Sequence, residues 1–250
     1  MTRVTLLTKI YNSHQLKELD RNVKELLGDL SVEVQFKGTS AGRWVELDIS
    51  GEDEAVAEKL LEREAGFCPI RLENVKKFAS LKGYVTGLGK STDELVLDIG
   101  VFEPKTVHST VTLAYLRTHL ANGKNVPLRQ ISESWGICEN LRLEIKVLEV
   151  NLEENCVRSE LQASQIHKFA QWKDSLLDRL VVIGASLGEL KWAIEQEGLN
   201  RDVIDIESFG MFEHALVCKL GTDAAGLIGR VGRRLRKAKF TVFNPKTITI

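Results

Sequence analysis

The chain has 250 residues, of which 43% are hydrophobic and 28% are charged, and its formal net charge is −1. This composition is typical of a globular protein and excludes both a disordered chain and a generally polybasic one. Any affinity for nucleic acid therefore has to come from a local patch of charge. We expect neither a signal peptide nor a membrane-spanning helix, because no apolar stretch is long enough to cross a bilayer.

Residues 1–76 have the pattern of a ferredoxin-like α/β domain. Strand and helix patterns alternate in the order of a strand at 3–10, a helix at 13–27, strands at 31–37 and 43–49, a helix at 52–65 and a strand at 68–73. Ser13 is the expected N-cap of the first helix, and Gly28 ends it. The order βαββαβ predicts a ferredoxin-like sandwich.

Residues 77–166 have the pattern of a small β-barrel. Apolar and polar residues alternate on both sides of the turn-rich stretch Gly87–Asp93, which predicts a β-hairpin. Further strand patterns lie at 109–113, 141–152 and 156–164, with a helical segment after the first of these. Five short strands in this arrangement are typical of an OB-type Greek-key barrel, a fold that often binds RNA or DNA.

Three segments of this block resemble the opening strands of S1-type RNA-binding domains: Lys82–Thr86, Leu95–Gly100 and Thr110–Leu116. The resemblance implies a barrel that binds RNA. S1 domains stack bases on aromatic residues of their second and third strands, but Ser91–Leu97 contains no aromatic residue. We therefore expect binding to single strands that is either weak or led by contacts to the nucleic-acid backbone. Residues 117–136 form a long insertion where S1 domains have a short connection.

Residues 167–250 repeat the βαββαβ order, which predicts a second ferredoxin-like domain. The patterns are a strand at 179–183, a helix at 187–197, strands at 203–209 and 213–220, a helix at 224–236 and a strand at 240–244. Residues 165–178 are too apolar for a free linker. They predict a helix packed between the barrel and this last domain.

Charge is segregated within the C-terminal block. Residues 219–246 contain eight cationic residues and one acid, whereas residues 189–213 contain seven acids and two cations. Four cations recur at helical spacing and share one helix face: Arg230, Arg233, Arg234 and Lys237. This ridge indicates contacts to phosphate groups, since the guanidinium fork suits phosphate oxygens, and a solvated helix face is the alternative.

Two local resemblances compete for the same segment. Gly229–Gly232 resembles the G-x-x-G loop of KH domains, which implies that it clamps a nucleic-acid backbone. Gly221–Ile228 resembles the strand-to-helix turn of ACT-type domains, which implies the sensing of a small molecule.

The sequence contains no recognisable catalytic motif. Gly87–Ser91 lacks the first glycine of a P-loop and precedes a strand instead of a helix, so we do not expect it to bind a nucleotide. The five histidines do not pair at helical spacing, and the four cysteines are scattered without a C-x-x-C pair. We expect buried reduced thiols, no metal, no cofactor and no enzymatic activity.

Taken whole, the chain resembles an archaeal domain-of-unknown-function family. The resemblance rests on VTLLTKIY near the start, VLDIGVFEPK in the centre and EHALVCKLGTDA near the end. It extends over most of the length and implies an archaeal, cytoplasmic setting without a known activity.

The sequence thus predicts an α+β protein in which a central S1-like OB barrel is flanked by two ferredoxin-like domains. The leading hypothesis is a non-enzymatic RNA-binding protein linked to translation or RNA processing. The alternatives are a protein adaptor on a ribosome or RNA polymerase complex, and an ACT-like small-molecule sensor. The candidate RNA-binding residues are Lys82, Tyr84 and Lys90 on the barrel, Arg117, Lys124 and Arg129 in the insertion, and Arg230, Arg233, Arg234, Arg236, Lys237 and Lys239 near the C-terminal helix. The three in the insertion are equally consistent with solvated loop charges.

Overall fold

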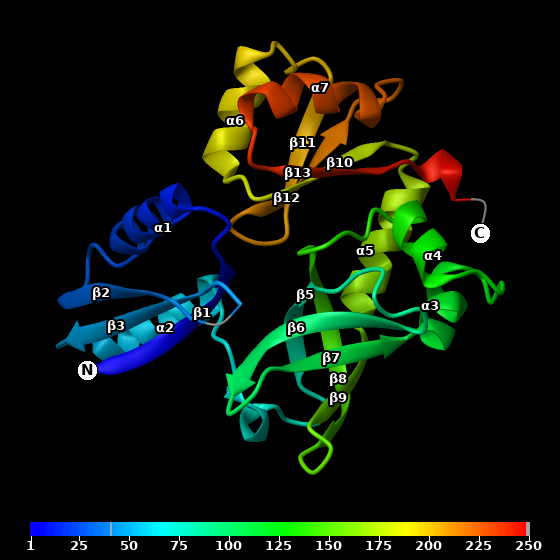
Figure 1. Cartoon of the computed structure of the whole chain (residues 1–250). Coiled ribbons are helices and arrows are strands. Elements are labelled where there is room, and N and C mark those ends of the chain that lie inside the picture. Colours follow the sequence, from blue (N-terminus) through cyan, green and yellow to red (C-terminus); the bar gives the residue numbers. More distant parts are fainter. Residues whose placement is uncertain (41, 249–250) are drawn as a thin grey trace. The chain divides into compact units, whose positions relative to one another are not determined.

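The structure is a computed structural model that describes residues 1–40 and 42–248 (Figure 1). The chain divides into two compact units. One unit consists of residues 1–74 and 100–106, and the other consists of residues 75–99 and 107–250. The chain therefore passes from one unit to the other more than once.

The first unit contains an antiparallel sheet of strand order β1-β3-β2 with two helices. In chain order, its elements are β1 (Thr2–Lys9), α1 (Ser13–Leu26), β2 (Val32–Thr39), β3 (Trp44–Gly51), α2 (Glu54–Glu64), β4 (Ile70–Arg71) and a 3₁₀ turn (Leu72–Asn74). Asn12, and not the expected Ser13, caps α1: its side chain accepts from the backbone N–H groups of His14 and Gln15. The Gln15 side chain bonds back to the Asn12 N–H at 3.3 Å, which completes a capping box.

The expected last strand of this unit, 68–73, does not form as one strand. Leu7 N donates to Gly66 O at 2.8 Å and Cys68 N donates to Thr5 O at 2.8 Å, so the chain pairs only briefly with β1. Pro69 has no N–H to continue the ladder, and Ile70 has a φ of 65°, which turns the chain away. It then forms β4, which pairs in parallel with Val101 and Glu103 of β6.

The second unit begins with the barrel, and its pairing confirms the OB-type arrangement. The barrel strands are β5 (Ser80–Val85), β6 (Glu94–Glu103), β7 (Val107–Thr112), β8 (Arg142–Asn151) and β9 (Cys156–Leu161), and the last four residues of β6 belong to the first unit. They pair in the order β6-β5-β8-β9-β7, and a further β6–β7 pairing closes the barrel. β7 and β9 are parallel, while β5 is antiparallel to both of its neighbours. This is the Greek-key order of the OB fold.

Gly83 shows how tightly the barrel is filled. A Cβ at this position would lie 3.1 Å from the Leu97 Cβ and 3.2 Å from the Ile99 Cγ2. Gly83 therefore faces the interior, where side chains of β6 take the space. Because side chains alternate along a strand, Lys82 and Tyr84 share the outer face of β5.

Three helices accompany the barrel strands in the described chain: α3 (Leu113–Leu120), α4 (Leu128–Ser134) and α5 (Ala163–Asp174). The first two form the expected insertion between the third and fourth barrel strands. The helix α5 confirms that the segment before the last domain is not a free linker. Its Trp172 ring lies 5.1 Å from the ring of Phe243 in the C-terminal sheet, centroid to centroid.

The C-terminal part has the strand order β11-β12-β10-β13 of a ferredoxin-like sheet, with all neighbours antiparallel. Its elements are β10 (Arg179–Ile183), α6 (Leu187–Gln196), β11 (Val203–Ser208), β12 (Glu213–Cys218), α7 (Ala224–Arg234), β13 (Lys239–Phe243) and a 3₁₀ turn (Pro245–Thr247). Leu180 of β10, Leu190 of α6, Leu216 of β12 and Leu227 of α7 belong to one buried cluster, so both helices cover the same face of the sheet (Figure 1). None of the helices in the described chain has both the length and the apolar character needed to cross a bilayer.

Candidate nucleic-acid interface

On the outer face of β5, Lys82 is exposed and Tyr84 is fully buried. Tyr84 pairs with Arg142 across the β5–β8 ladder, and the Arg142 guanidinium carbon lies 5.8 Å from the centre of the tyrosine ring. Arg142 also donates from Nη1 to Phe209 O at 3.5 Å. The ring face of Tyr84 is therefore covered, and in this structure it is not on the surface where a base could stack.

The loop that carries Lys90 holds a carboxylate instead of a phosphate. Gly87 N and Leu88 N each donate to the Glu139 carboxylate at 3.1 Å, and Lys90 N donates to Gly87 O at 2.9 Å. These glycine-loop amides are thus already occupied by a negative group from the same chain. The Lys90 side chain is exposed at the tip of the loop.

Two arginines of the insertion have partners within it. Arg117 Nε donates to Val126 O at 2.8 Å and so holds the turn that follows α3. Arg129 Nε donates to Glu133 at 2.7 Å, one helical turn away. Lys124 is exposed between them. Arg117 therefore stabilises the insertion, whereas Arg129 and Lys124 lie on its surface.

The ridge of Arg230, Arg233 and Arg234 lies on α7 and is bound to acids of the neighbouring segment. Arg234 Nε donates to Glu197 at 2.7 Å and Arg233 Nη2 donates to it at 2.9 Å, while Arg230 contacts the Glu197 carbonyl and lies 3.6 Å from Asp202. The hydrogen bond from Arg234 holds the pKa of Glu197 below its usual range. Much of the ridge charge is thus neutralised inside the domain.

The helix α7 ends at Arg234, two residues earlier than expected, so Lys237 does not share its face. Leu235 is buried and serves as the C-cap, after which the chain turns into β13. Arg236, Lys237 and Lys239 are all exposed around this turn. The G-x-x-G stretch 229–232 is part of α7, so the loop of a KH domain is not formed here.

Trp192 of α6 is a surface aromatic residue that the sequence patterns did not single out. Its residue surface is 48% exposed, and the Arg234 guanidinium carbon lies 5.6 Å from its ring centre. Its position offered a signal, because it falls outside the helical period of the buried residues Leu190, Ala193 and Ile194. An exposed ring beside arginines is a surface on which a base can stack.

A second group of cations surrounds a pocket of about 240 Å³ on the barrel side of the C-terminal sheet. Lys82 of β5, Arg142 of β8 and Lys168 of α5 line this pocket, and Glu144 is the one carboxylate among its lining residues. We call it the cationic pocket. It contains a residue that the sequence predicted, Lys82, together with two cations from distant parts of the chain.

Gln165 supplies a buried donor to the cationic pocket. The residue is 3% exposed, and its Oε1 accepts from Glu144 N at 3.2 Å. Its amide nitrogen is buried and has no hydrogen-bond partner within the described residues. Since a buried N–H group without a partner costs free energy, this donor favours an acceptor such as a phosphate oxygen in the pocket.

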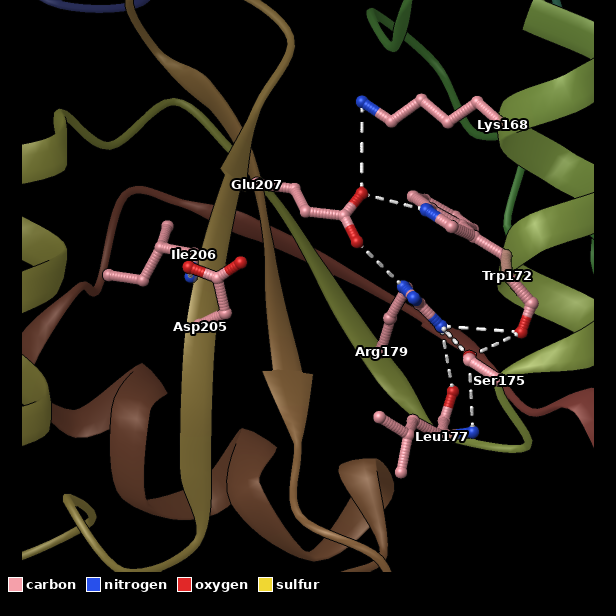
Figure 2. Close-up of polar contacts among 8 residues, drawn as sticks. All are labelled: Lys168, Trp172, Ser175, Leu177, Arg179, Asp205, Ile206 and Glu207. Atoms are coloured by element: carbon pink, nitrogen blue, oxygen red, sulfur yellow. Dashed lines mark hydrogen bonds and ion pairs between the residues drawn. The ribbon is translucent and has the colours of Figure 1, made fainter.

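Glu207 contacts Lys168, one of the residues that line the pocket. Figure 2 shows its carboxylate between α5 and β10: Trp172 Nε1 donates to it at 2.7 Å and Arg179 Nε at 3.1 Å, and Lys168 Nζ lies 3.7 Å away. Burial lowers the pKa of Lys168, and the charge of Glu207 opposes that change. Lys168 also lies 4.0 Å from the centre of the Phe209 ring. These contacts fix the lysine before any ligand arrives.

A serine and a histidine also meet at the edge of this pocket. Ser208, which lines it, lies 2.8 Å from His214 Nδ1, and His214 Nε2 lies 3.3 Å from the carbonyl of Met211. In the tautomer whose Nε2–H donates to that carbonyl, Nδ1 accepts from the serine hydroxyl. No carboxylate in the described chain bonds to this imidazole, so the pair lacks the third member of a catalytic triad.

Three family models match consecutive parts of the sequence: the DUF2110 N-terminal domain at residues 3–68, the DUF2110 central domain at 75–173 and the DUF2110 C-terminal domain at 177–243. No match was found among the curated proteins. Among solved structures, the chain is similar to the crystal structure of the a/eIF2alpha–aDim2p–rRNA complex from Pyrococcus horikoshii OT3, at 12% identity, covering 52% of this chain and 70% of that chain. The TM-score is 0.25, so this likeness carries no argument about function. Because the three models together match most of the sequence, the chain belongs to the DUF2110 family.

Proposed function

We propose that this protein binds RNA without catalysing a reaction, and that it acts in translation or RNA processing. The observation that carries the proposal is the cationic pocket, where Lys82, Arg142 and Lys168 converge beside the Gln165 amide nitrogen, which has no hydrogen-bond partner among the described residues. Cations and N–H donors of this kind bind the phosphate groups of nucleic acids. The OB-type barrel that carries two of the cations is a common scaffold for binding oligonucleotides.

The C-terminal surface supports the same proposal. Trp192 offers an exposed ring, and Arg236, Lys237 and Lys239 are exposed cations in the same domain. Stacking on an aromatic ring combined with charge contacts is a common way to bind single-stranded RNA. The assignment to translation or RNA processing rests on the resemblance of the barrel strands to S1 domains.

Lys82→Gln tests the proposal, because Lys82 is exposed and its replacement leaves the fold undisturbed. Fluorescence anisotropy would measure the binding of a short single-stranded RNA at several salt concentrations. We expect wild-type binding to weaken steeply with salt, and the slope of log K against log salt to fall by about 0.7 in the variant, the value for one phosphate contact to a single strand.

Lys76→Gln is the matched control for this experiment, since Lys76 is an exposed lysine of the same unit that does not line the pocket. It should bind RNA like the wild type. If both variants lose the same amount of RNA affinity, the RNA contact lies elsewhere on the surface. If the wild type binds no RNA even at low salt, the proposed function is wrong.

The edge strand β11 favours a second candidate, an adaptor that binds a ribosome or RNA polymerase complex through protein contacts. Ile204 on this strand is 56% exposed, and a groove of about 510 Å³ runs between β11 and α6, with Leu187 and Ile194 in its wall. An exposed edge strand can pair with a strand of another protein. Co-purification of such a complex that survives nuclease treatment and is lost in Ile204→Lys would support this candidate over RNA binding.

A further inference from the structure

A separate pocket of about 510 Å³ lies between the barrel loop 87–93 and the helix α4. We call it the loop–α4 pocket. Its apolar wall includes Leu88 of the loop, Leu128 at the start of α4 and Ile137 after that helix. The volume and the mainly apolar lining are those of a small-ligand site.

A few polar groups are set into this apolar wall. Ser132 of α4 is 2% exposed, and its hydroxyl is buried without a hydrogen-bond partner in the part of the chain that the structure describes. Arg129 and Glu133 lie at the rim, joined by one hydrogen bond of 2.7 Å. That bond uses a single N–H of the guanidinium and a single oxygen of the carboxylate. The rim therefore retains both donors and acceptors for a ligand.

Both walls of the pocket are fixed. The Glu139 carboxylate holds the loop through the backbone N–H groups of Gly87 and Leu88, and Trp135 Nε1 donates to Leu120 O at 2.8 Å, which ties the end of α4 to α3. Because the walls are already ordered, binding a ligand costs less conformational entropy of the protein.

We propose that the loop–α4 pocket takes one unstacked nucleobase, and this inference rests on the proposed RNA binding. A base has two apolar faces and a polar edge with neighbouring donors and acceptors, which matches an apolar pocket with a buried hydroxyl and a mixed rim. A free nucleoside presents the same chemistry, so the experiment has to distinguish it from a base within RNA.

The short stretch of chain between the two pockets favours a base within RNA over a free nucleoside. Lys82 lines the cationic pocket, and Leu88, six positions later on the same continuous stretch, lines the loop–α4 pocket. Six residues span at most about 20 Å, so the two pockets are close enough for one strand of a few nucleotides to reach both. Phosphate contacts at the first pocket would then position the strand, and the base at the second would be the part that is read.

The test compares a short single-stranded RNA with an oligonucleotide of the same length whose sugar–phosphate backbone is intact but whose bases are missing. We expect the wild type to bind the complete RNA on the order of tenfold more tightly than the abasic one. Ser132→Leu fills the pocket and should remove this difference, while its affinity for the abasic strand stays unchanged. Ser134→Leu, on the same helix but outside the pocket lining, should retain the difference.

Ser132→Ala is a second variant, for the case that leucine disturbs the fold. It removes the hydroxyl without filling the pocket. It should reduce the preference for complete RNA several-fold, and its melting temperature should be at least that of the wild type, because the alanine removes a buried hydroxyl without a partner among the described residues. Equal, salt-dependent binding of both strands by the wild type would overturn the base pocket and leave RNA binding intact. A thermal shift with free guanosine or adenosine, but no binding of either strand, would overturn both and identify a small-molecule site.

Discussion

His214 is a buried histidine of β12, 2% exposed, and burial lowers its pKa. The unfolded chain therefore takes up a proton at this residue more readily than the folded protein does. The free energy of unfolding should fall as the pH drops below about 6.5, the pKa of an unperturbed histidine, until the lower folded pKa is passed. At neutral pH and above, this residue adds no pH dependence.

Urea unfolding at pH 7.5 and pH 5.5 measures this effect in the wild type and in His214→Gln. Glutamine can still accept from the Ser208 hydroxyl but does not titrate, so the variant should lose less stability between the two pH values. The two proteins differ only at this position, so the difference between their losses reports on His214. An equal loss in both would show that His214 is not the residue responsible.

Single residues of the site were predictable where the pattern is local, and not where distant segments meet. Strand alternation in the sequence predicted the β-strand that carries Lys82 and Tyr84, and the structure has β5 there. The alternation could not show that Arg142, almost sixty positions later, covers the tyrosine ring. Gln165 and Lys168 join the pocket through the packing of α5, for which no sequence motif exists.

At the scale of elements, the contact between α6 and α7 controls how much of the basic ridge is available. Glu197 follows the C-terminal end of α6 and binds Arg233 and Arg234. Glu197→Gln should weaken both ion pairs, lower the melting temperature and raise RNA affinity at low salt, because the released guanidinium groups can contact phosphates. Anisotropy titrations together with thermal unfolding measure both effects.

Glu195→Gln is the control for this variant, since Glu195 is an exposed acid of the same helix and the change in net charge is identical. Its melting temperature should remain unchanged and its affinity should rise less. If the two variants gain the same affinity, the gain comes from net charge alone and the ridge is not a specific contact.

The elements themselves followed from the sequence wherever hydrophobic periodicity decides, as in the βαββαβ order of the C-terminal sheet. Their ends depended on tertiary contacts. The helix α7 ends at Arg234 because Leu235 turns into the core, although Arg236 and Lys237 continue the helical charge pattern. Pro69 breaks the strand expected at 68–73. The proline is visible in the sequence, but its effect follows only once Cys68 is known to pair with β1.

At the scale of the whole second unit, the Trp172–Glu207 hydrogen bond joins α5 to the C-terminal sheet (Figure 2). Trp172→Phe keeps an aromatic ring next to Phe243 but removes this bond. We expect the free energy of unfolding in urea to fall by about 2 kcal/mol, the usual value for a hydrogen bond to a charged group. Trp192→Phe is the control, because replacing this exposed tryptophan should lower the free energy of unfolding very little. An equal loss of free energy in both variants would contradict the role of the Trp172–Glu207 bond.

The discontinuous first unit has a consequence for synthesis on the ribosome. Residues 1–74 emerge first, but residues 100–106, which include the fully buried Val101, belong to the same unit. At 5–20 residues per second, the first unit waits about two to six seconds for its last segment, while β5 and most of β6 are made in between. A fragment that stops at residue 74 therefore omits part of its own core. A fragment that starts at residue 75 contains the whole second unit but also carries residues 100–106 without the rest of the first unit, including Ile70, which pairs with Val101.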